Sequence, residues 1–364
     1  MTIIHISSAL SWRGGEQQIA NLLLELSKSN IHQIVICPKD SPLFHFCIKN
    51  SMQVKLFRKR AGFDPWLAFQ ITQLCRKADK PLLHAHDSHA HTAAFLSAFL
   101  WMNKTPIIVH RRVGFSVKKS VLSSLKYNHN SITRIICISE YVRRMVNLSL
   151  VKPDKTRMVY DGIDLNKFSG QPNNHFLRNR FHLNDNHILI GNISAITVEK
   201  DYITFVDTAE ILLINHPDLR FFVIGEGSQK QFISEYIKGK GLADKFFMTG
   251  FLDNIQDILP ELDLVLFTSI NEGLGTSLLD AFACRIPVAA TNAGGIPEIV
   301  QDHKTGLAVE IKKPKEMALA VEEILNNQKL KNELVENAFQ MVQQFSTERM
   351  ASEILKIYHE ILAG

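Results

Sequence analysis

Short apolar runs alternate with longer amphipathic stretches along the sequence, and the whole series occurs twice. Apolar runs separated by segments of helical length are typical of parallel sheets whose two faces are covered by helices. The first series of expected strands is Ile3–Ser7, Gln33–Cys37, Leu82–His86, Ile107–His110 and Ile135–Ile138. The second series is Ile188–Ile193, Arg220–Ile224, Phe246–Thr249, Leu264–Phe267, Pro287–Thr291 and Leu307–Val309. The sequence therefore predicts an α/β chain with two consecutive doubly wound, Rossmann-like domains.

Amphipathic segments of helical length lie between the expected strands. In the first half they are Glu16–Lys28, Pro65–Ala78, Ala90–Trp101 and Glu140–Leu148. In the second half they are Tyr202–Ile214, Ser228–Lys238, Ile255–Glu261, Ser277–Cys284, Pro314–Asn326 and Leu330–Gln344. A final segment, Glu348–Leu362, has an apolar side that predicts one more packed helix.

The length of 364 residues is about twice that of a usual domain, which agrees with two domains. The polar segment Lys167–Asn174, with Gly170 and Pro172, is the expected linker. Because ligands bind beyond the carboxyl ends of parallel strands, two such sheets predict a cleft between the domains. Candidate site residues are therefore expected where a strand ends and a helix begins.

Charge is divided unevenly along the chain. Residues 1–165 contain 23 Lys and Arg against 10 Asp and Glu, whereas the remaining residues contain 18 against 26. A basic half predicts contact with an anionic surface or substrate. No helix-turn-helix, zinc-finger or aromatic-basic RNA motif occurs, so nucleic acid is not an expected partner. An anionic membrane face, a phosphorylated acceptor and ordinary solvated helix faces remain as explanations.

The cysteines and the N-terminus bear on the cellular compartment. The five cysteines are scattered and never spaced C-x-x-C, which argues against a disulfide framework or a structural zinc site. The first ten residues, MTIIHISSAL, lack the basic start of a signal peptide and predict a buried strand. We therefore expect a cytoplasmic protein, with peripheral contact on the inner face of the membrane as a further possibility.

The most informative stretch covers residues 269–300, SINEGLGTSLLDAFACRIPVAATNAGGIPEIV. A glycine-bearing loop follows an expected strand and precedes a helix, and the free amides at a helix N-terminus favour an anion such as a diphosphate. Glu272 and Asp280 are separated by seven residues, which puts two carboxylates beside that position. Carboxylates are suited to accepting hydrogen bonds from sugar hydroxyls. A helix cap with an exposed aspartate is the plainer alternative.

This stretch resembles the E-x7-E signature of the family 4 retaining glycosyltransferases, which have the GT-B fold. Further segments resemble elements of the same family in the same order, so the resemblance covers nearly the whole chain. They are Gly14-Gly15-Glu16, residues 159–164 (VYDGID), residues 223–227 (VIGEG), Gly250-Phe251 and the terminal helix. The resemblance implies a domain over 1–166, completed by a C-terminal helix at about 347–364, and a nucleotide-sugar domain over 167–346.

The resemblance also implies roles for individual residues. Glu272 would contact hydroxyls of the transferred sugar, Asp280 would hold the ribose, and Lys200 would neutralise the departing diphosphate. Gly14 and Gly15 would let a loop of the first domain close over the phosphates. The other donor-binding residues would be Gly250, Phe251, Gly273, Leu274, Gly275, Thr276 and Ser277.

The sequence departs from the family pattern at three positions. Asp280 replaces a glutamate and is one methylene shorter. Ala195 occupies the position of an arginine, so one cation of the diphosphate clamp is missing. Asp161 stands where the family usually has asparagine. None of these changes abolishes the site on physical grounds.

Four histidines lie within eight residues, at His84, His86, His89 and His91. Four imidazoles could bind zinc, but a strand that turns into a helix spreads them in different directions, so we expect no metal. The family has a functional histidine at the end of this strand, and only His86 is taken as a site residue on that resemblance.

Arg111 and Arg112 end another expected strand and could clamp an acceptor phosphate or carboxylate. The following segment places Val121, Leu122 and Leu125 among Lys118, Lys119 and Lys126, a pattern of interfacial helices. Acceptor recognition, membrane contact and a solvated face are all compatible with this segment.

Together these features predict a glycosyltransferase that moves a hexosyl or related group from a nucleoside-diphosphate sugar to a glycan or lipid-linked acceptor. The resemblance implies retention at the anomeric carbon and no metal cofactor, as in polysaccharide biosynthesis. A degenerate, non-catalytic GT-B module is one alternative, because of Ala195 and Asp280. A two-domain dehydrogenase or epimerase is the other, but Gly225-x-Gly227 lacks the third glycine of a dinucleotide fingerprint.

Overall fold

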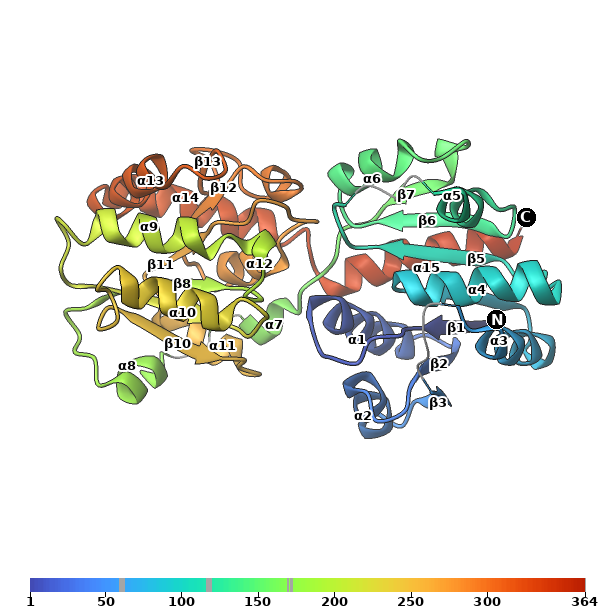
Figure 1. The fold of residues 1–364 in the computed structure, drawn as a ribbon. Coiled ribbons are helices and arrows are strands. Elements are labelled where there is room, and N and C mark those ends of the chain that lie inside the picture. Colours follow the sequence, from blue (N-terminus) through green and yellow to red (C-terminus); the bar gives the residue numbers. More distant parts are fainter. Residues whose placement is uncertain (59–62, 116–119, 169, 171–172, 364) are drawn as a thin grey trace. The chain divides into compact units, whose positions relative to one another are not determined.

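The computed structural model describes residues 1–58, 63–115, 120–168, 170 and 173–363, and these form two compact units. Unit 1 contains residues 1–162 together with the segment from Thr347 onward, and unit 2 contains Ile163–Ser346 (Figure 1). The division falls between Gly162 and Ile163, ahead of the expected boundary at 166. Within the expected linker, residues 169, 171 and 172 lie outside the described ones, and Lys167 belongs to the short helix α7 (Leu165–Phe168).

Unit 1 is built on a seven-stranded sheet in the order β3-β2-β1-β4-β5-β6-β7, and every pairing is parallel. Its strands are β1 (Thr2–Ile6), β2 (His32–Pro38), β3 (Gln53–Phe57), β4 (Pro81–Ala85), β5 (Ile107–Arg111), β6 (Ile132–Cys137) and β7 (Thr156–Met158). The parallel sheet confirms the predicted fold class for this half. The edge strands β3 and β7 were not predicted, because β3 is mostly exposed and β7 has only three residues.

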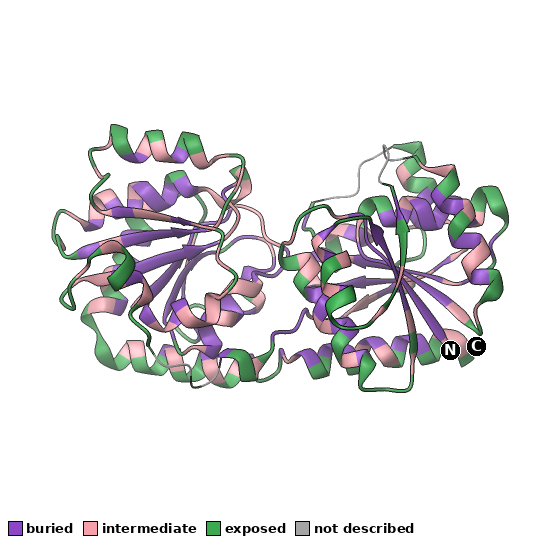
Figure 2. Ribbon diagram, turned by 90° about the horizontal axis from the view of Figure 1, so that it is seen from below, coloured by how far each residue is buried: buried purple, intermediate pink, exposed green. Residues whose placement is uncertain are grey.

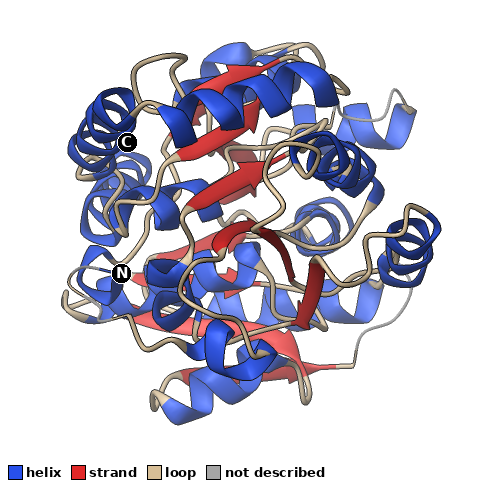
Figure 3. Ribbon diagram, turned by 90° about the vertical axis from the view of Figure 1, so that its left-hand side faces the viewer, coloured by secondary structure: helices blue, strands red, loops and turns tan. Residues whose placement is uncertain are grey.

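Figure 3 shows helices on both sides of strands. Unit 1 has helices of its own. They are α1 (Gly14–Ser27), α2 (Pro42–Lys49), α3 (Pro65–Lys77), α4 (Ser88–Trp101), α5 (Val121–Asn128), α6 (Glu140–Asn147) and α15 (Thr347–Ala363), with the short η1 (Pro153–Lys155). The apolar side of α15 packs with α1 against the central strands, where Met350 and Ile354 join Leu22 and Ile108 in one buried cluster. The terminal helix therefore completes unit 1.

Unit 2 repeats the architecture with a six-stranded parallel sheet in the order β10-β9-β8-β11-β12-β13. The strands are β8 (Ile188–Ile193), β9 (Leu219–Ile224), β10 (Phe246–Gly250), β11 (Leu264–Phe267), β12 (Val288–Thr291) and β13 (Leu307–Val309). The helices are α7, α8 (Phe176–Phe181), α9 (Tyr202–Leu212), α10 (Lys230–Gly239), α11 (Ile255–Ile258), α12 (Thr276–Ala283), α13 (Pro314–Asn326) and α14 (Gln328–Val342). Short 3-10 turns are η2 (Val198–Lys200), η3 (Leu259–Glu261) and η4 (Ile296–Glu298). The two-domain α/β prediction is thus confirmed.

Two local differences from the predicted helices have simple causes. The helix expected over 255–261 is divided into α11 and η3, because Pro260 cannot donate the backbone hydrogen bond of an α-helix. The short α8 was not predicted from its charged sequence FLRNRF. Its first turn depends on a distant residue, because the buried Glu261 carboxylate accepts from the amide of Leu177 at 2.9 Å.

In both units the central strands are buried and the outer faces of the helices are exposed (Figure 2). The carboxyl ends of the strands therefore carry the loops in which polar side chains can gather. In the described part of the chain, no helix has both the length and the apolar character that crossing a bilayer requires.

Candidate functional site

The loop between β11 and α12 in unit 2 presents the start of a helix. Gly275 is the N-cap residue of α12 and has a positive φ of 91°, a conformation that glycine adopts without strain. Leu274 is 1% exposed, so it anchors the loop and can offer a ligand only its backbone. Since Gly275 has no side chain, no N-cap group competes for the amides of the first turn, which includes Thr276 and Ser277.

An ion pair between Lys200 and Glu272 lies at the carboxyl ends of the strands of unit 2. Both side chains are mostly buried, at 19% and 17% exposed. The Glu272 carboxylate also accepts from the hydroxyl of Ser269 at 3.4 Å and from the amide of Gly273 at 3.3 Å. The two residues are 72 positions apart in the sequence, and the structure brings them together.

Local structure fixes Lys200 at this position. The residue ends the 3-10 turn η2, and its amide donates to the carbonyl of Thr197 at 3.1 Å. The next residue, Asp201, caps α9 through its side chain, and the Thr268 hydroxyl donates to the Lys200 carbonyl at 3.0 Å. The ammonium group is therefore carried on a backbone that is held from both sides.

Gly294 supports the backbone of Glu272, and our sequence analysis did not assign it to the site. It has a positive φ of 61°, and a Cβ atom there would lie 2.2 Å from the carbonyl oxygen of Glu272. The neighbouring amide of Gly295 donates to that same oxygen at 3.0 Å. Gly294 belongs to the stretch of residues 269–300, and the close backbone approach shows why glycine is needed there.

We expect Gly294→Ala to lower the free energy of unfolding by more than about 2 kcal/mol, because the new methyl group clashes with backbone and the φ becomes strained. Gly239→Ala is the matched control, since a Cβ there meets no atom of the described residues within 4 Å. Denaturant titration of both variants measures the difference. Equal stability of the two variants would contradict the assigned packing.

Asp280 lies on α12, and its carboxylate makes no hydrogen bond or ion pair with the residues that the structure describes. Burial raises the pKa of Asp280 to about 7, and the positive charge of Lys167 opposes this effect. A carboxyl group without a protein partner is free to accept hydrogen bonds from ligand hydroxyls.

Gly250 is the last residue of β10, and Phe251 follows it. Gly250 has a positive φ of 78° and pairs with Gly225, whose amide donates to the Gly250 carbonyl at 3.0 Å. Phe251 leaves 53% of its side chain exposed. An exposed aromatic ring beside a polar loop is a surface on which a planar group can stack.

In unit 1 the predicted glycine loop is wrong in one respect. Gly14 and Gly15 are the first residues of helix α1, with Arg13 at the N-cap, because the Glu16 carboxylate accepts from the Arg13 amide at 3.1 Å and closes the first turn. A Cβ on Gly15 would meet only the Arg112 side chain, at 3.9 Å. The two glycines thus form a helix start.

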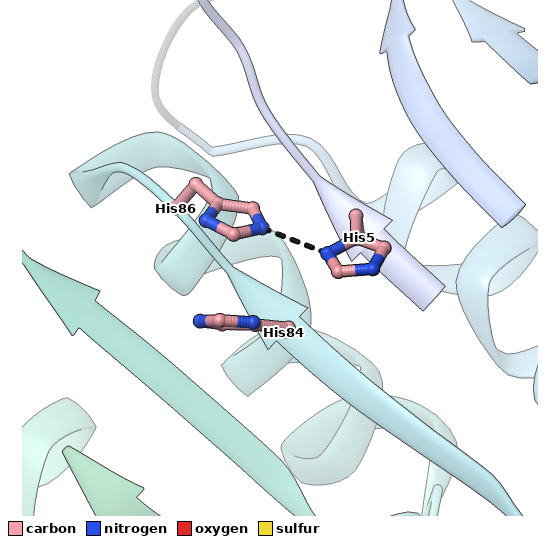
Figure 4. Close-up of side chains that lie close together, drawn as sticks. All are labelled: His5, His84 and His86. Atoms are coloured by element: carbon pink, nitrogen blue, oxygen red, sulfur yellow. Dashed lines mark hydrogen bonds between the residues drawn. The ribbon is translucent and has the colours of Figure 1, made fainter. Parts of the chain in front are cut away.

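His86 is buried within a cluster of histidines at the carboxyl ends of the central strands. Its Nε2 lies 3.0 Å from Nδ1 of His5 (Figure 4). Nδ1 of His84 lies 2.6 Å from the hydroxyl of Tyr358. His5 and His84 are register partners on β1 and β4, which puts their rings on one face of the sheet. His5 was not predicted, because 81 positions separate it from His86.

These contacts bear on metal binding. One ligand nitrogen from each of His5, His84 and His86 lies within 4.8 Å of the others, which is the spacing of a potential metal site. Two of the three rings are hydrogen-bonded to each other, and the third is bonded to Tyr358. His89 is exposed and His91 packs against Tyr127, so the four sequence neighbours do not form one cluster.

Arg111 and Arg112 are committed to contacts inside unit 1. Arg112 lies beside the buried Asp161 carboxylate at 3.4 Å and donates to the backbone carbonyl of His86 at 3.4 Å. Arg111 donates to the carbonyl of Phe115 at 2.6 Å. The carboxylate at position 161, a departure from the family pattern, thus has a cation beside it. Lys118 and Lys119 lie outside the described residues.

Comparisons with known proteins match the chain to glycosyltransferases. The family model for glycosyl transferases group 1 matches residues 173–341, and that for glycosyltransferase family 4 matches residues 12–167. The N-acetyl-alpha-D-glucosaminyl L-malate synthase of Bacillus anthracis is 26% identical over 308 residues, covering 82% of this chain and 80% of its own. An Escherichia coli UDP-Gal:alpha-D-GlcNAc-diphosphoundecaprenol alpha-1,3-galactosyltransferase is 23% identical over 323 residues, covering 82% and 81%.

Among solved structures, Anabaena Alr3699/HepE in complex with UDP and glucose matches with a TM-score of 0.87. The match covers 99% of this chain and 100% of that one at 18% sequence identity. A likeness at this identity shows that the two chains share a fold.

Proposed function

Since the chain belongs to the family 4 glycosyltransferases of the GT-B fold, we propose that its donor substrate is a nucleoside-diphosphate sugar. The sugar is transferred to a glycan or lipid-linked acceptor, as in polysaccharide biosynthesis, with retention at the anomeric carbon and without a metal cofactor. The names of its relatives support this proposal, since they include a transferase acting on a diphosphoundecaprenol-linked sugar. The HepE complexes with UDP and UDP-glucose make uridine nucleotides the first donors to test.

The observation that carries the proposal is the Lys200–Glu272 pair beside the glycine-capped start of α12. A diphosphate bound there meets the first amides of the helix and the ammonium group of Lys200. These groups stabilise the negative charge that develops as the diphosphate leaves, as a metal ion does in other transferases. Glu272, held by Ser269 and Gly273, then offers its carboxylate to hydroxyls of the sugar.

The experiment that tests this function follows the anomeric proton by NMR during turnover of an alpha-configured donor, with and without EDTA. We expect an alpha-linked product, or alpha-configured free sugar from slow hydrolysis, at a rate that EDTA does not change. A beta product would overturn retention. Nucleotide binding without transfer to any acceptor or to water would favour the degenerate module.

The pKa of Asp280 gives the proposed donor site a pH dependence. Asp280 binds its proton more tightly in the native state than in the unfolded chain. Protonation of Asp280 therefore stabilises the fold at low pH, and this stabilisation is lost as the pH rises from the ordinary pKa of aspartate through about 7. The ionised form accepts hydrogen bonds from ribose hydroxyls. We therefore expect affinity for the nucleoside-diphosphate sugar, whose phosphates do not titrate in this range, to rise several-fold from about pH 6 to about pH 8.

Calorimetric titrations over this range test the expectation, with Asp280→Asn as the comparison. The variant should bind with a weaker and nearly constant affinity, because it has no titrating carboxyl group. The same pH dependence in the variant would show that Asp280 does not hold the nucleotide.

We also propose that unit 1 contacts an anionic membrane where lipid-linked acceptors reside. Helix α5 exposes an apolar face, with Val121, Leu122 and Leu125 at 88%, 58% and 43% exposed, within the half of the chain that has excess positive charge. We expect co-sedimentation with phosphatidylglycerol vesicles and little with phosphatidylcholine vesicles. Leu122→Glu combined with Leu125→Glu should abolish it without changing transfer to a water-soluble acceptor. If the double variant sediments with the vesicles as the wild type does, α5 is not the membrane contact.

A further inference from the structure

We propose that a groove of unit 1, between strand β3 and helix α3, holds part of the hydrocarbon chain of a lipid-linked acceptor, with Lys55 and Lys77 supplying positive charge for its phosphate groups. The inference rests on the proposed function, in which the acceptor is a glycan or is lipid-linked, and it selects the lipid-linked class. The residues that line the groove lie outside the motifs that identified the family.

Apolar side chains from the sheet and from α3 line the groove. The sheet contributes Ile36 on β2 and Leu56 on β3, and the helix contributes Leu67 and Leu74. Leu56 is 41% exposed, so the apolar surface is open to a ligand. The groove has a volume of about 280 Å³, close to the lower end of the roughly 300–1,000 Å³ typical of small-molecule sites. A space of this size accommodates one segment of a long chain.

The charged side chains that line the groove are both cationic. Lys55 lies on β3 and Lys77 in the last turn of α3, and both are exposed. Among the described lining residues there is no Asp or Glu, and Gln70 and Gln73 are polar but uncharged. Neither ammonium group has an ion-pair partner in the part of the chain that the structure describes. Apolar walls with unpaired cations complement an amphiphile that has a hydrocarbon chain and a phosphate.

An aromatic cluster extends the groove toward α4. Phe69 lines the groove, and its ring stacks on Trp66 with 5.6 Å between the ring centroids. The centroid of Trp101, on α4, lies 4.9 Å from that of Phe69. Trp66 and Trp101 are 58% and 39% exposed. Exposed tryptophan rings are typical of surfaces at a membrane interface, so a chain that leaves the groove meets a surface of that kind.

This surface is continuous with the helix proposed to contact the membrane. Helix α3 packs against α4, and the Lys126 ammonium of α5 donates to the Ser88 carbonyl and the Thr92 hydroxyl of α4. Helix α4 therefore lies between α3 and α5 (Figure 1). The crossovers that contain these helices advance across the sheet in one direction, and right-handed crossovers of that kind put their helices on one face. Contact of α5 with a bilayer thus brings the groove toward the lipids.

Titration calorimetry with decyl phosphate, below the concentration at which it forms micelles, tests the groove without any turnover. Across shorter alkyl phosphates we expect affinity to rise about two- to fourfold for each added methylene and then to level off as the groove fills. Inorganic phosphate and decanol should each bind about tenfold more weakly or less. Lys55→Ala combined with Lys77→Ala should weaken decyl phosphate binding about tenfold. Lys49→Ala combined with Lys152→Ala removes two exposed lysines outside the groove and is the matched control.

The charge in the groove is tested by Gln73→Glu, which keeps the shape of the side chain and puts a carboxylate one turn from Lys77. This variant should also weaken decyl phosphate binding about tenfold. With the acceptor sugar attached either to decyl diphosphate or to a methyl group, it should lower the preference for the decyl form, measured as the ratio of kcat/KM values, by a similar factor.

Decyl phosphate binding that is unchanged in both groove variants would overturn the proposal. Decanol bound as tightly as decyl phosphate would overturn the phosphate-bearing class, and an unchanged preference for the decyl form would overturn the link to the acceptor. If the protein transfers sugar to no acceptor, the proposed function fails, while the calorimetry still decides whether the groove binds an alkyl phosphate.

Discussion

Replacing Lys200 with alanine is expected to reduce the rate of sugar transfer about tenfold or more while unit 2 stays folded. In the proposed function, the ammonium group of Lys200 is the cation that stabilises the departing diphosphate, and Ala195 supplies no second cation. Its removal also leaves the Glu272 carboxylate without its ion-pair partner, so a diphosphate would meet an uncompensated negative charge. We therefore expect weaker binding of the nucleoside diphosphate as well as slower turnover.

Calorimetry and a transfer assay on Lys200→Ala measure the two effects. Lys304→Ala removes an exposed lysine from the same unit and is the matched control. Turnover and nucleotide affinity equal to those of Lys304→Ala would remove Lys200 from the site.

Replacing Glu272 with alanine is expected to lower transfer by a similar factor, about tenfold or more, but with the opposite effect on the nucleotide. The carboxylate is assigned to sugar hydroxyls, and in the free protein it also holds Lys200. Without Glu272 the ammonium group is released for the diphosphate. The free nucleoside diphosphate should therefore bind at least as tightly as it does to the wild type, whereas the sugar part of the donor should add no affinity.

The affinities of Glu272→Ala for the nucleoside diphosphate and for its sugar conjugate, measured by calorimetry, test this prediction. Glu333→Gln changes an exposed glutamate on α14 and is the control. Loss of affinity for both ligands would mean that Glu272 supports the phosphate site. If the variant still binds the sugar conjugate more tightly than the nucleoside diphosphate, as the wild type should, Glu272 does not contact the donor sugar. Because Lys200 and Glu272 touch, the double variant should lose less than the sum of the single changes.

The fold could be predicted because buried parallel strands appear in the sequence as apolar runs. Strands such as β1 and β11 are buried along their whole length, and their bounds differ little from those expected. The sequence of the exposed edge strand β3 lacks an apolar run, so it cannot be told from a polar loop. Helix α8 depends on the buried Glu261, a long-range contact that local propensity cannot indicate.

The candidate site was predicted to a different extent in the two units. In unit 2 the loop, the carboxylates and Lys200 were recognised from their motifs, but the ion pair and the packing of Gly294 depend on backbones that approach only in the fold. In unit 1 the partners of His86 and Arg112 lie far away in the sequence. His5 comes from the first strand, and Asp161 stands beside Arg112 only after the sheet has formed.

The most direct test of the nucleotide-sugar assignment is a thermal-shift comparison of the wild-type protein with UDP, GDP, ADP and their common sugar conjugates, with and without magnesium. A ligand that binds only the native state raises Tm by mass action. We expect a rise with one nucleotide family that is the same without magnesium, and a smaller rise for that family in Lys200→Ala. No rise with any nucleotide, or a rise only when magnesium is present, would contradict the account.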